Sequence, residues 1–182
     1  MQAIRSILVV IQPDLPEQLA LKRARLIAGV TQSHLHLLVC AEANQDHSAL
    51  LDGLAEELAA EGFSCSAQQA WQESPHQTVI AAQQSEGCTL VIKQHRRDSL
   101  LKKAFLTPED WKLLRYCPCP VLMVKSDDPW TGRAILAAVD VGNSDSEHQT
   151  LHTGIVSHAS DIAHLCQGEL HVLSAHPSPM LS

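Results

Sequence analysis

The sequence predicts an α/β layered fold with a doubly wound, mostly parallel sheet, and three observations support this prediction. Short apolar runs typical of buried strands alternate along the chain with segments of helical periodicity. Five such strands precede residue 126, and parallel neighbours need crossover connections, which are usually helical. Apolar residues make up 45% of the 182 residues, which is enough for a packed core.

Each predicted element has a local signal. Ile7–Ile11 is a continuous, largely β-branched run that stops before Pro13, as expected of a strand buried on both faces. In the next segment apolar residues recur at helical spacing and basic residues fill the other face. We expect Ser48 to cap the second helix and Thr107 to cap a later helix with an acidic first turn. The predicted strands are 7–11, 35–40, 64–71, 89–92 and 120–125, and the predicted helices are 17–30, 48–62, 75–87 and one that follows Thr107.

The remainder of the chain is a partial copy of its beginning. Residues 126–132 are rich in turn formers and are interpreted as a linker between a first domain, 1–125, and an incomplete repeat, 133–182. In the repeat, 135–140 resembles 7–12. The repeat supplies only one strand-helix-strand unit and is shorter than the roughly 70 residues that support an independent core. We therefore expect either a shortened form of a longer tandem protein or completion by another subunit.

Charge and hydropathy exclude two classes of partner. Thirteen basic against twenty acidic residues leave a formal charge of −7, which disfavours a nucleic acid partner. No apolar run approaches the roughly 20 residues of a membrane span, and the first residues do not resemble a secretion signal. A soluble, cytoplasmic protein is expected.

Cysteines and histidines suggest no metal site. The six cysteines are expected to be free thiols, and Pro118 argues against a shared face for the close pair Cys117 and Cys119. His148 and His152 lie one helical turn apart but show no His-Glu-x-x-His pattern, so a solvated face is the simpler interpretation, although Asp145 and Glu147 nearby could complete a metal site. His36 and His171 stand among apolar strand residues and are expected to be buried and neutral, and Trp111 to fill a core or interface.

No motif for catalysis is present. The chain contains no Gly-x-Ser-x-Gly elbow, no catalytic-cysteine signature and no Gly-x-Gly-x-x-Gly after the first strand. We therefore predict that the protein is not an enzyme and has no catalytic residues.

The order of elements over residues 4–125, with the opening strand Ile7–Ile11 and the closing strand Pro120–Lys125, resembles the universal stress protein family. The segments 105–111 and 113–115, together with the repeat from Arg133, are similar to the tandem E-type branch. The resemblance implies an adenine nucleotide alpha hydrolase-like sheet of order 3-2-1-4-5. It also implies a cytoplasmic stress-response role and domain pairing through the fifth strand.

The resemblance also bears on ATP. ATP-binding members carry Gly-x2-Gly-x9-Gly-Ser/Thr after the fourth strand, where bare backbone approaches phosphate. Alignment on the last strand places Gln94, Arg97, Thr107 and Pro108 at these positions, and Gln12 replaces an acidic residue at the end of the first strand. No ATP cofactor is therefore expected for residues 1–125. Asp140 retains the acidic residue in the repeat, which ends before a phosphate loop.

The carboxyl ends of the strands are the expected ligand crevice of such a sheet. Cations in the segment after the fourth strand, Arg96, Arg97, Lys102 and Lys103, suggest a small anionic ligand. The candidate ligand-binding residues are Gln12, Asp14, Cys40, Gln94, His95, Arg97, Thr107 and Asp140.

Three hypotheses follow for function. The first is a non-catalytic stress-response protein that self-associates through the edge strand Pro120–Lys125 or binds a ligand other than ATP. The second is a nucleotide-binding switch that uses Asp140 and a site completed by another subunit. The third is an enzyme that holds an anionic substrate against His95, Arg96 and Arg97.

Overall fold

The computed structural model describes residues 4–95, 106–140, 142 and 145–174. The chain divides into two compact units, an N-terminal unit that ends at Asp127 and a C-terminal unit that begins at Asp128. The elements of the N-terminal unit are β1 (Ser6–Ile11), α1 (Leu19–Thr31), β2 (His34–Cys40), α2 (Ser48–Ala60), β3 (Cys65–Ala70), α3 (Pro75–Glu86), β4 (Leu90–Gln94), α4 (Pro108–Tyr116) and β5 (Val121–Val124). Those of the C-terminal unit are β6 (Ala134–Val139), α5 (Ser146–Leu165) and β7 (Glu169–Ser174).

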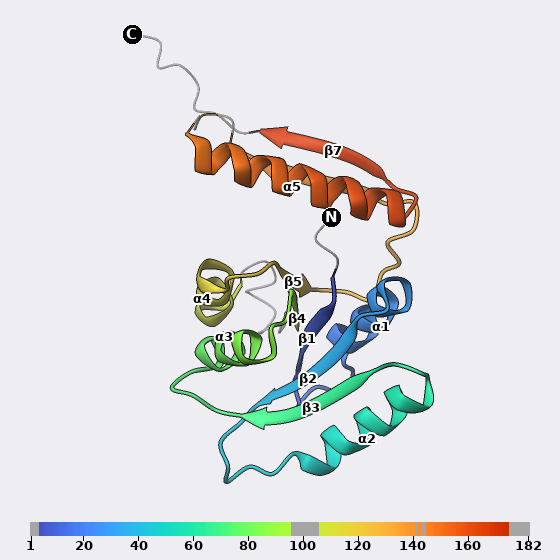
Figure 1. Cartoon of the computed structure of the whole chain (residues 1–182), viewed down its shortest axis with the longest axis vertical. Coiled ribbons are helices and arrows are strands. Elements are labelled where there is room, and N and C mark those ends of the chain that lie inside the picture. The colour runs from blue at the N-terminus through green and yellow to red at the C-terminus, as the bar shows by residue number, and fades with distance from the viewer. Residues whose placement is uncertain (1–3, 96–105, 141, 143–144, 175–182) are drawn as a thin grey trace. The chain divides into compact units, whose positions relative to one another are not determined.

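The five strands of the N-terminal unit form one parallel sheet of order β3-β2-β1-β4-β5. This is the predicted order, and β1 lies in the middle of the sheet (Figure 1). In the register, Ile7 stands opposite Leu35 of β2 and Leu90 of β4. The predicted fold class is confirmed.

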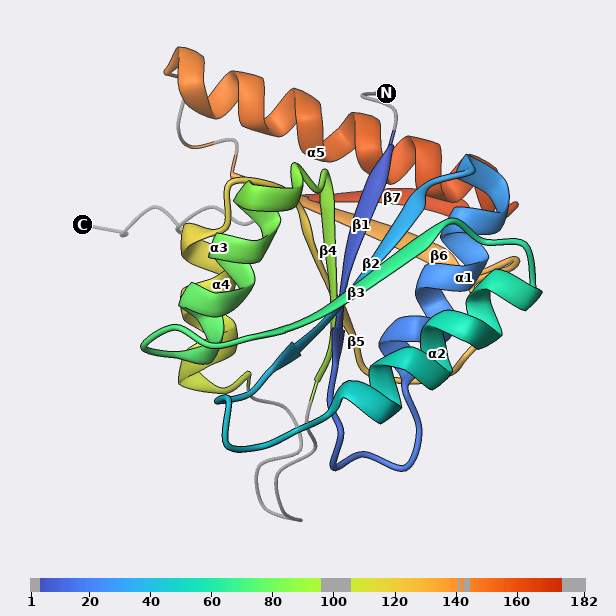
Figure 2. The same cartoon turned by 60° about the horizontal axis from the view of Figure 1, so that its bottom comes forward.

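Helices cover both faces of this sheet, α1 and α2 on one side and α3 and α4 on the other (Figure 2). Ile7, Val9 and Ile11 of β1 belong to the core beneath α1 and α2. Leu8 and Val10 belong to the core beneath α3. Because successive strand side chains point to opposite faces, a strand covered on both faces must be apolar throughout.

Local details at three predicted positions differ from expectation. Ser48 is the first residue of α2, and His47 takes the N-cap position that the sequence suggested for Ser48. Trp111 is 60% exposed, so it does not fill the core. The fourth strand continues to Gln94, two residues beyond its predicted end, which places Gln94 on the sheet.

The C-terminal unit is a β-α-β unit with two parallel strands. In β6 and β7, Ile135 stands opposite Leu170, as Ile7 stands opposite Leu35 in the first unit. The small core contains Ala137 of β6, and α5 packs on both strands. Leu136 and Val172 are 62% and 56% exposed. The prediction that His171 is buried is wrong, because a two-stranded sheet has too few neighbours to enclose it.

Candidate functional site

The candidate site begins at the carboxyl ends of β1 and β4, where three glutamines form a closed hydrogen-bond network. Nε2 of Gln12 donates to the carbonyl of Gln94 over 3.0 Å. The side-chain oxygen of Gln94 accepts from the amide of Leu19 at the start of α1 over 2.8 Å. Gln18 closes the loop after β1, since its amide group both donates to the Gln12 carbonyl and accepts from the Gln12 amide.

This network fills the place where the sequence suggested a ligand crevice. Gln12 is 8% exposed, and its Oε1 atom receives no hydrogen bond from the described residues. Leu19 is the first residue of α1, and its amide donates to the Gln94 side chain. In an open crevice this amide would be available to a ligand. The glutamines therefore connect β1, β4 and α1 to one another and leave one buried acceptor without a partner.

A second polar cluster lies between β4 and the start of α4. Asp110 is fully buried and accepts hydrogen bonds from Nζ of Lys93 and from the amide of Thr107. The Thr107 hydroxyl accepts from the Asp110 amide over 3.2 Å, which completes a capping box. Nδ1 of His95 lies 3.7 Å from the Asp110 carboxylate and makes no hydrogen bond with a described residue.

The electrostatics of this cluster do not suit a triphosphate. Burial is the largest influence and opposes ionisation of Asp110, but the hydrogen bond and charge of Lys93 together with the hydrogen bonds to Thr107 outweigh it, so the pKa of the carboxyl lies below its ordinary value. Pro108 has no amide, and the Asp110 amide is already bonded to Thr107. Glu109 and Asp110 both lie in the first turn, so negative charge already occupies this helix N-terminus.

The other predicted site residues come from separate parts of the chain. Cys40 ends β2, and burial raises the pKa of its thiol to about 12, while the nearby charge of Lys93 lowers it. Asp14 is exposed in the loop after β1. Asp140 follows β6 in the C-terminal unit, where its carboxylate accepts from the amide of Gly142 over 3.0 Å. Arg97, like the other three cations of its segment, lies outside the described residues.

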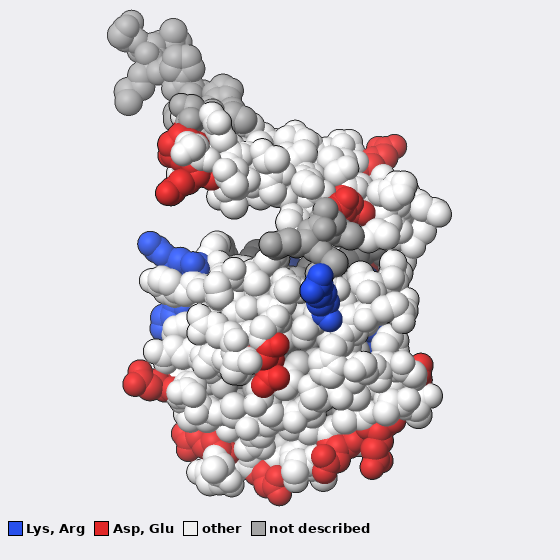
Figure 3. All heavy atoms as spheres, viewed as in Figure 1, with Lys and Arg blue, Asp and Glu red and all other residues white. Residues whose placement is uncertain are grey.

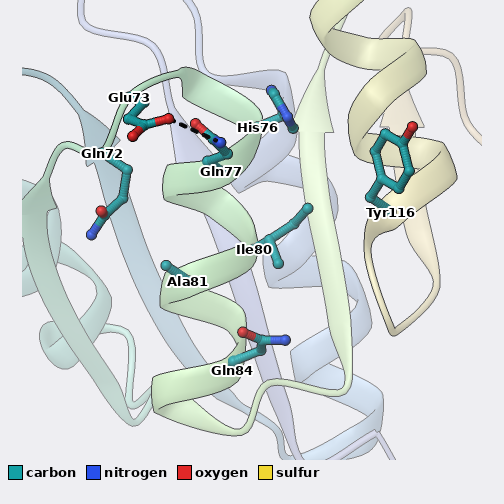
Figure 4. A pocket seen from close by; sticks show the side chains of 8 residues that line it. All are labelled: Gln72, Glu73, His76, Gln77, Ile80, Ala81, Gln84 and Tyr116. Atoms are coloured by element: carbon teal, nitrogen blue, oxygen red, sulfur yellow. Dashed lines mark hydrogen bonds between the residues drawn. The ribbon is translucent and has the colours of Figure 1, made fainter.

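Two hollows are lined by residues outside the glutamine network. One, of about 460 Å³, is formed by α3 and the turn before it, with Tyr116 of α4 at its border (Figure 4). Next to it, a hydrogen bond from His76 lowers the pKa of Glu109 to about 2. The other, of about 650 Å³, lies between the start of α2 and the ends of β2 and β3, beside Trp71. Among the described residues that line the two hollows, none is a Lys or Arg that would attract an anion.

Several acidic side chains line one border of the N-terminal unit. In Figure 3, Asp and Glu follow the lower border of the N-terminal unit, where α2 lies. Asp46, Asp52, Glu56 and Glu57, all exposed, belong to α2 or to the loop before it. Such a surface repels polyanions.

His36 is buried, as predicted. Its burial makes the stability of the fold depend on pH. His36 is 4% exposed, and its Nδ1 atom is 2.7 Å from the Ser66 hydroxyl. Burial lowers the pKa of His36 below the ordinary value of 6.5, although the carboxylate of Glu86, 3.9 Å away, opposes the shift. The unfolded chain therefore binds this proton at higher pH than the folded chain. The stabilisation is complete above pH 6.5 and is lost as the pH falls below that value.

We expect urea unfolding to show lower stability at about pH 5.5 than at about pH 7.5, with a smaller difference in His36→Asn. His164→Asn, at an exposed position of α5, is the control and should retain the wild-type pH dependence. Equal pH dependence in wild type and His36→Asn would show that His36 does not carry the effect.

Comparison with known proteins assigns the fold to a family. Residues 3–125 match the Universal stress protein family. The chain belongs to this family. The match covers the five-stranded sheet and both polar clusters, and it confirms the resemblance that the sequence suggested.

Relatives of this universal stress protein point to the E-type branch. Universal stress protein E of Escherichia coli strain K12 is 28% identical over 200 residues, which cover 97% of this chain and 63% of the relative. A solved universal stress protein structure from Pseudomonas aeruginosa has a TM-score of 0.89 and 69% identity, and covers 98% of this chain and 64% of its own. The chain thus spans less than two thirds of the length of both relatives.

A third comparison shows the fold alone. A universal stress protein solved in complex with cAMP has a TM-score of 0.58 and 14% identity, and covers 69% of this chain and all of its own.

Sequence reasoning missed three residues that define the two clusters: Gln18, Lys93 and Asp110. The spacing Thr107-x-x-Asp110 is a capping-box pattern, so it could have identified the link between these two residues. Lys93 follows a buried strand run with no local signal of a buried partner. Its contact with Asp110 joins β4 to α4 and depends on how the helix packs on the sheet.

In the described part of the chain, no helix is long and apolar enough to cross a membrane.

Proposed function

We propose that this universal stress protein is a non-catalytic, cytoplasmic stress-response protein that acts by self-association or by binding a small anionic ligand other than ATP. The observation that carries this proposal is the glutamine network at the ends of β1 and β4. The side chains of Gln12 and Gln18 donate to the backbone carbonyls of Gln94 and Gln12, and the Gln94 side chain accepts from the Leu19 amide. These side chains stand where a nucleotide would need open backbone.

The start of α4 supports the same proposal. A triphosphate there would face the carboxylates of Glu109 and Asp110 at short range. It would also lack the amide of Pro108, and Lys93 is already neutralised by Asp110. A smaller anion would meet fewer of these groups, and the buried Nδ1 atom of His95 is the described group that is available to donate to it.

Self-association is the second half of the proposal. Among the described strands, β5 pairs only with β4, so the other edge of β5 is open. Its sequence Val-Leu-Met-Val has no charge to discourage a partner strand.

Isothermal titration with ATP and Mg²⁺ tests the ligand part. We expect no saturable heat at millimolar nucleotide, and the same result for Gln94→Gly, because the α4 carboxylates remain. Tight, saturable binding by the wild-type chain would contradict the proposal. Inorganic phosphate, titrated in parallel, tests the smaller anion. We expect the wild-type chain to bind phosphate and His95→Phe not to bind it.

A nucleotide switch centred on Asp140 is the second candidate. The family includes a member solved with cAMP, and Asp140 lies at the end of β6, the counterpart of the end of β1. On this alternative, wild type would bind ATP or cAMP and Asp140→Ala would not, whereas Gln12→Ala would bind unchanged.

A further inference from the structure

Cys117 and Cys119 form a pair of adjacent thiols between α4 and β5. Cys117 is the C-cap residue of α4, and Cys119 lies two residues before the first residue of β5. Their sulfur atoms are 3.8 Å apart. The expectation that Pro118 would keep them from sharing a face is wrong, because the chain leaves the helix at Cys117 and the turn through Pro118 directs both side chains to the same side.

Both cysteines are partly accessible to solvent and pack against the core. Each thiol is partly exposed, and both pack against the core beneath α3 and α4. The Cys117 amide donates to Leu113 of α4, and the carbonyl of Pro120 accepts from Val91 of β4. The pair is therefore held at both ends by regular structure.

We propose that Cys117 and Cys119 are a redox modification site, a dithiol that hydroperoxides oxidise to an intramolecular disulfide. In the described part of the chain, no other two sulfur atoms are in contact. A disulfide bond of about 2.05 Å requires the sulfurs to close by somewhat less than 2 Å. Rotation of the two side chains within the turn can supply most of this movement without displacing β5 from β4.

The oxidation proceeds in two balanced steps. The Cys117 thiolate attacks one oxygen of hydrogen peroxide, the O–O bond breaks, and the sulfur becomes a sulfenic acid as hydroxide leaves. The Cys119 sulfur then attacks the sulfenic sulfur, the S–S bond forms, and the hydroxyl leaves as water after taking up a proton. Two thiols and one peroxide thus give one disulfide and two waters.

The hydrogen bond between the two groups gives them different roles. The bond from the Cys119 thiol lowers the pKa of Cys117, and the same interaction raises the pKa of Cys119. Cys117 is therefore the attacking thiolate and Cys119 the resolving thiol. Burial raises the pKa values of Cys40 and Cys88, so these thiols react more slowly.

The test treats the reduced, full-length chain with stoichiometric hydrogen peroxide at neutral pH. We expect the number of alkylatable thiols to fall from six to four and the intact mass to fall by about 2 Da, the two hydrogens lost when a disulfide forms. The disulfide should map to the peptide that contains both Cys117 and Cys119, and dithiothreitol should restore six thiols.

Three variants distinguish a specific reaction of Cys117 and Cys119 from general oxidation of the thiols. Cys119→Ser should stop at the sulfenic acid, which dimedone traps on Cys117. Cys117→Ser should show at least tenfold slower loss of thiols. Cys65→Ser, which removes another partly exposed thiol, is the control and should still form the disulfide. Unchanged Cys117 and Cys119 after peroxide treatment, or disulfides that join different chains, would overturn the proposal.

Discussion

Replacing Asp110 by alanine is expected to lower the free energy of unfolding by about 3–5 kcal/mol, because the substitution leaves a buried cation without its partner. The Lys93 side chain is 15% exposed, and the Asp110 side chain is completely enclosed. The substitution also removes the capping box, so the Thr107 amide loses its acceptor at the start of α4. These losses affect the contact between α4 and β4.

The matched control for this prediction is Glu109→Ala, in the same first turn of α4. Glu109 is one-third exposed in its ion pairs with His76 and Lys112, and its removal should cost about 1 kcal/mol or less. Urea unfolding monitored by circular dichroism provides both values. Equal destabilisation by the two substitutions would show that Asp110 does not stabilise α4 through a buried ion pair.

The double variant Lys93→Met and Asp110→Leu refines the interpretation. Because it removes both buried charges together, it should be closer to wild type in stability than Asp110→Ala alone. A double variant as unstable as Asp110→Ala would assign the loss to the helix cap instead of the unpaired cation.

Replacing Met123 by proline is expected to weaken self-association at least tenfold, because the substitution removes a hydrogen-bond donor from the open edge of β5 and adds a ring there. The carbonyl of Pro120 accepts a hydrogen bond from Val91 of β4, and the carbonyl of Val124 accepts one from His95, the residue after β4. In a regular parallel strand, alternate residues face opposite neighbours, so the amide of Met123 points to the open edge. Proline at this position leaves the bonds between β4 and β5 in place.

Light scattering during size-exclusion chromatography measures this effect. We expect the wild-type chain to elute with the mass of two or more chains and Met123→Pro to shift to the mass of one. Met123→Leu keeps both the amide and an apolar side chain, and it should associate as the wild type does. A wild-type chain that stays monomeric at high concentration, or a proline variant that associates equally well, would contradict pairing through β5.

Several features of the fold could be predicted from single segments of sequence. The run Ile7–Ile11 is apolar at every position, which is typical of a strand covered on both faces, and β1 is the central strand. The Thr107 cap was also predicted, because a hydroxyl residue before proline and an acidic turn are local signals. His171 shows the limit of such signals, because its apolar neighbours resemble those of His36 but its strand has only one partner.

The candidate site depends more strongly on contacts between distant segments. The sequence identified Gln12 and Gln94 as departures from a nucleotide-binding pattern, but it could not show that they bond to one another or that Gln18 and Leu19 join them. The proximity of the Cys117 and Cys119 sulfurs was likewise predicted wrongly, since the direction of the turn at Pro118 is set by how α4 and β5 pack on β4.

The sequence alone determined the succession of strands and helices, the family and the absence of the phosphate-binding glycines, because each of these is written in short, contiguous patterns. Only the tertiary structure decided which side chains fill the expected ligand crevice and which thiols and charged groups contact one another. The physical reason is that hydrogen bonds such as those of Gln94 and Asp110 join residues from different elements, and their geometry exists only after the sheet and its helices have packed.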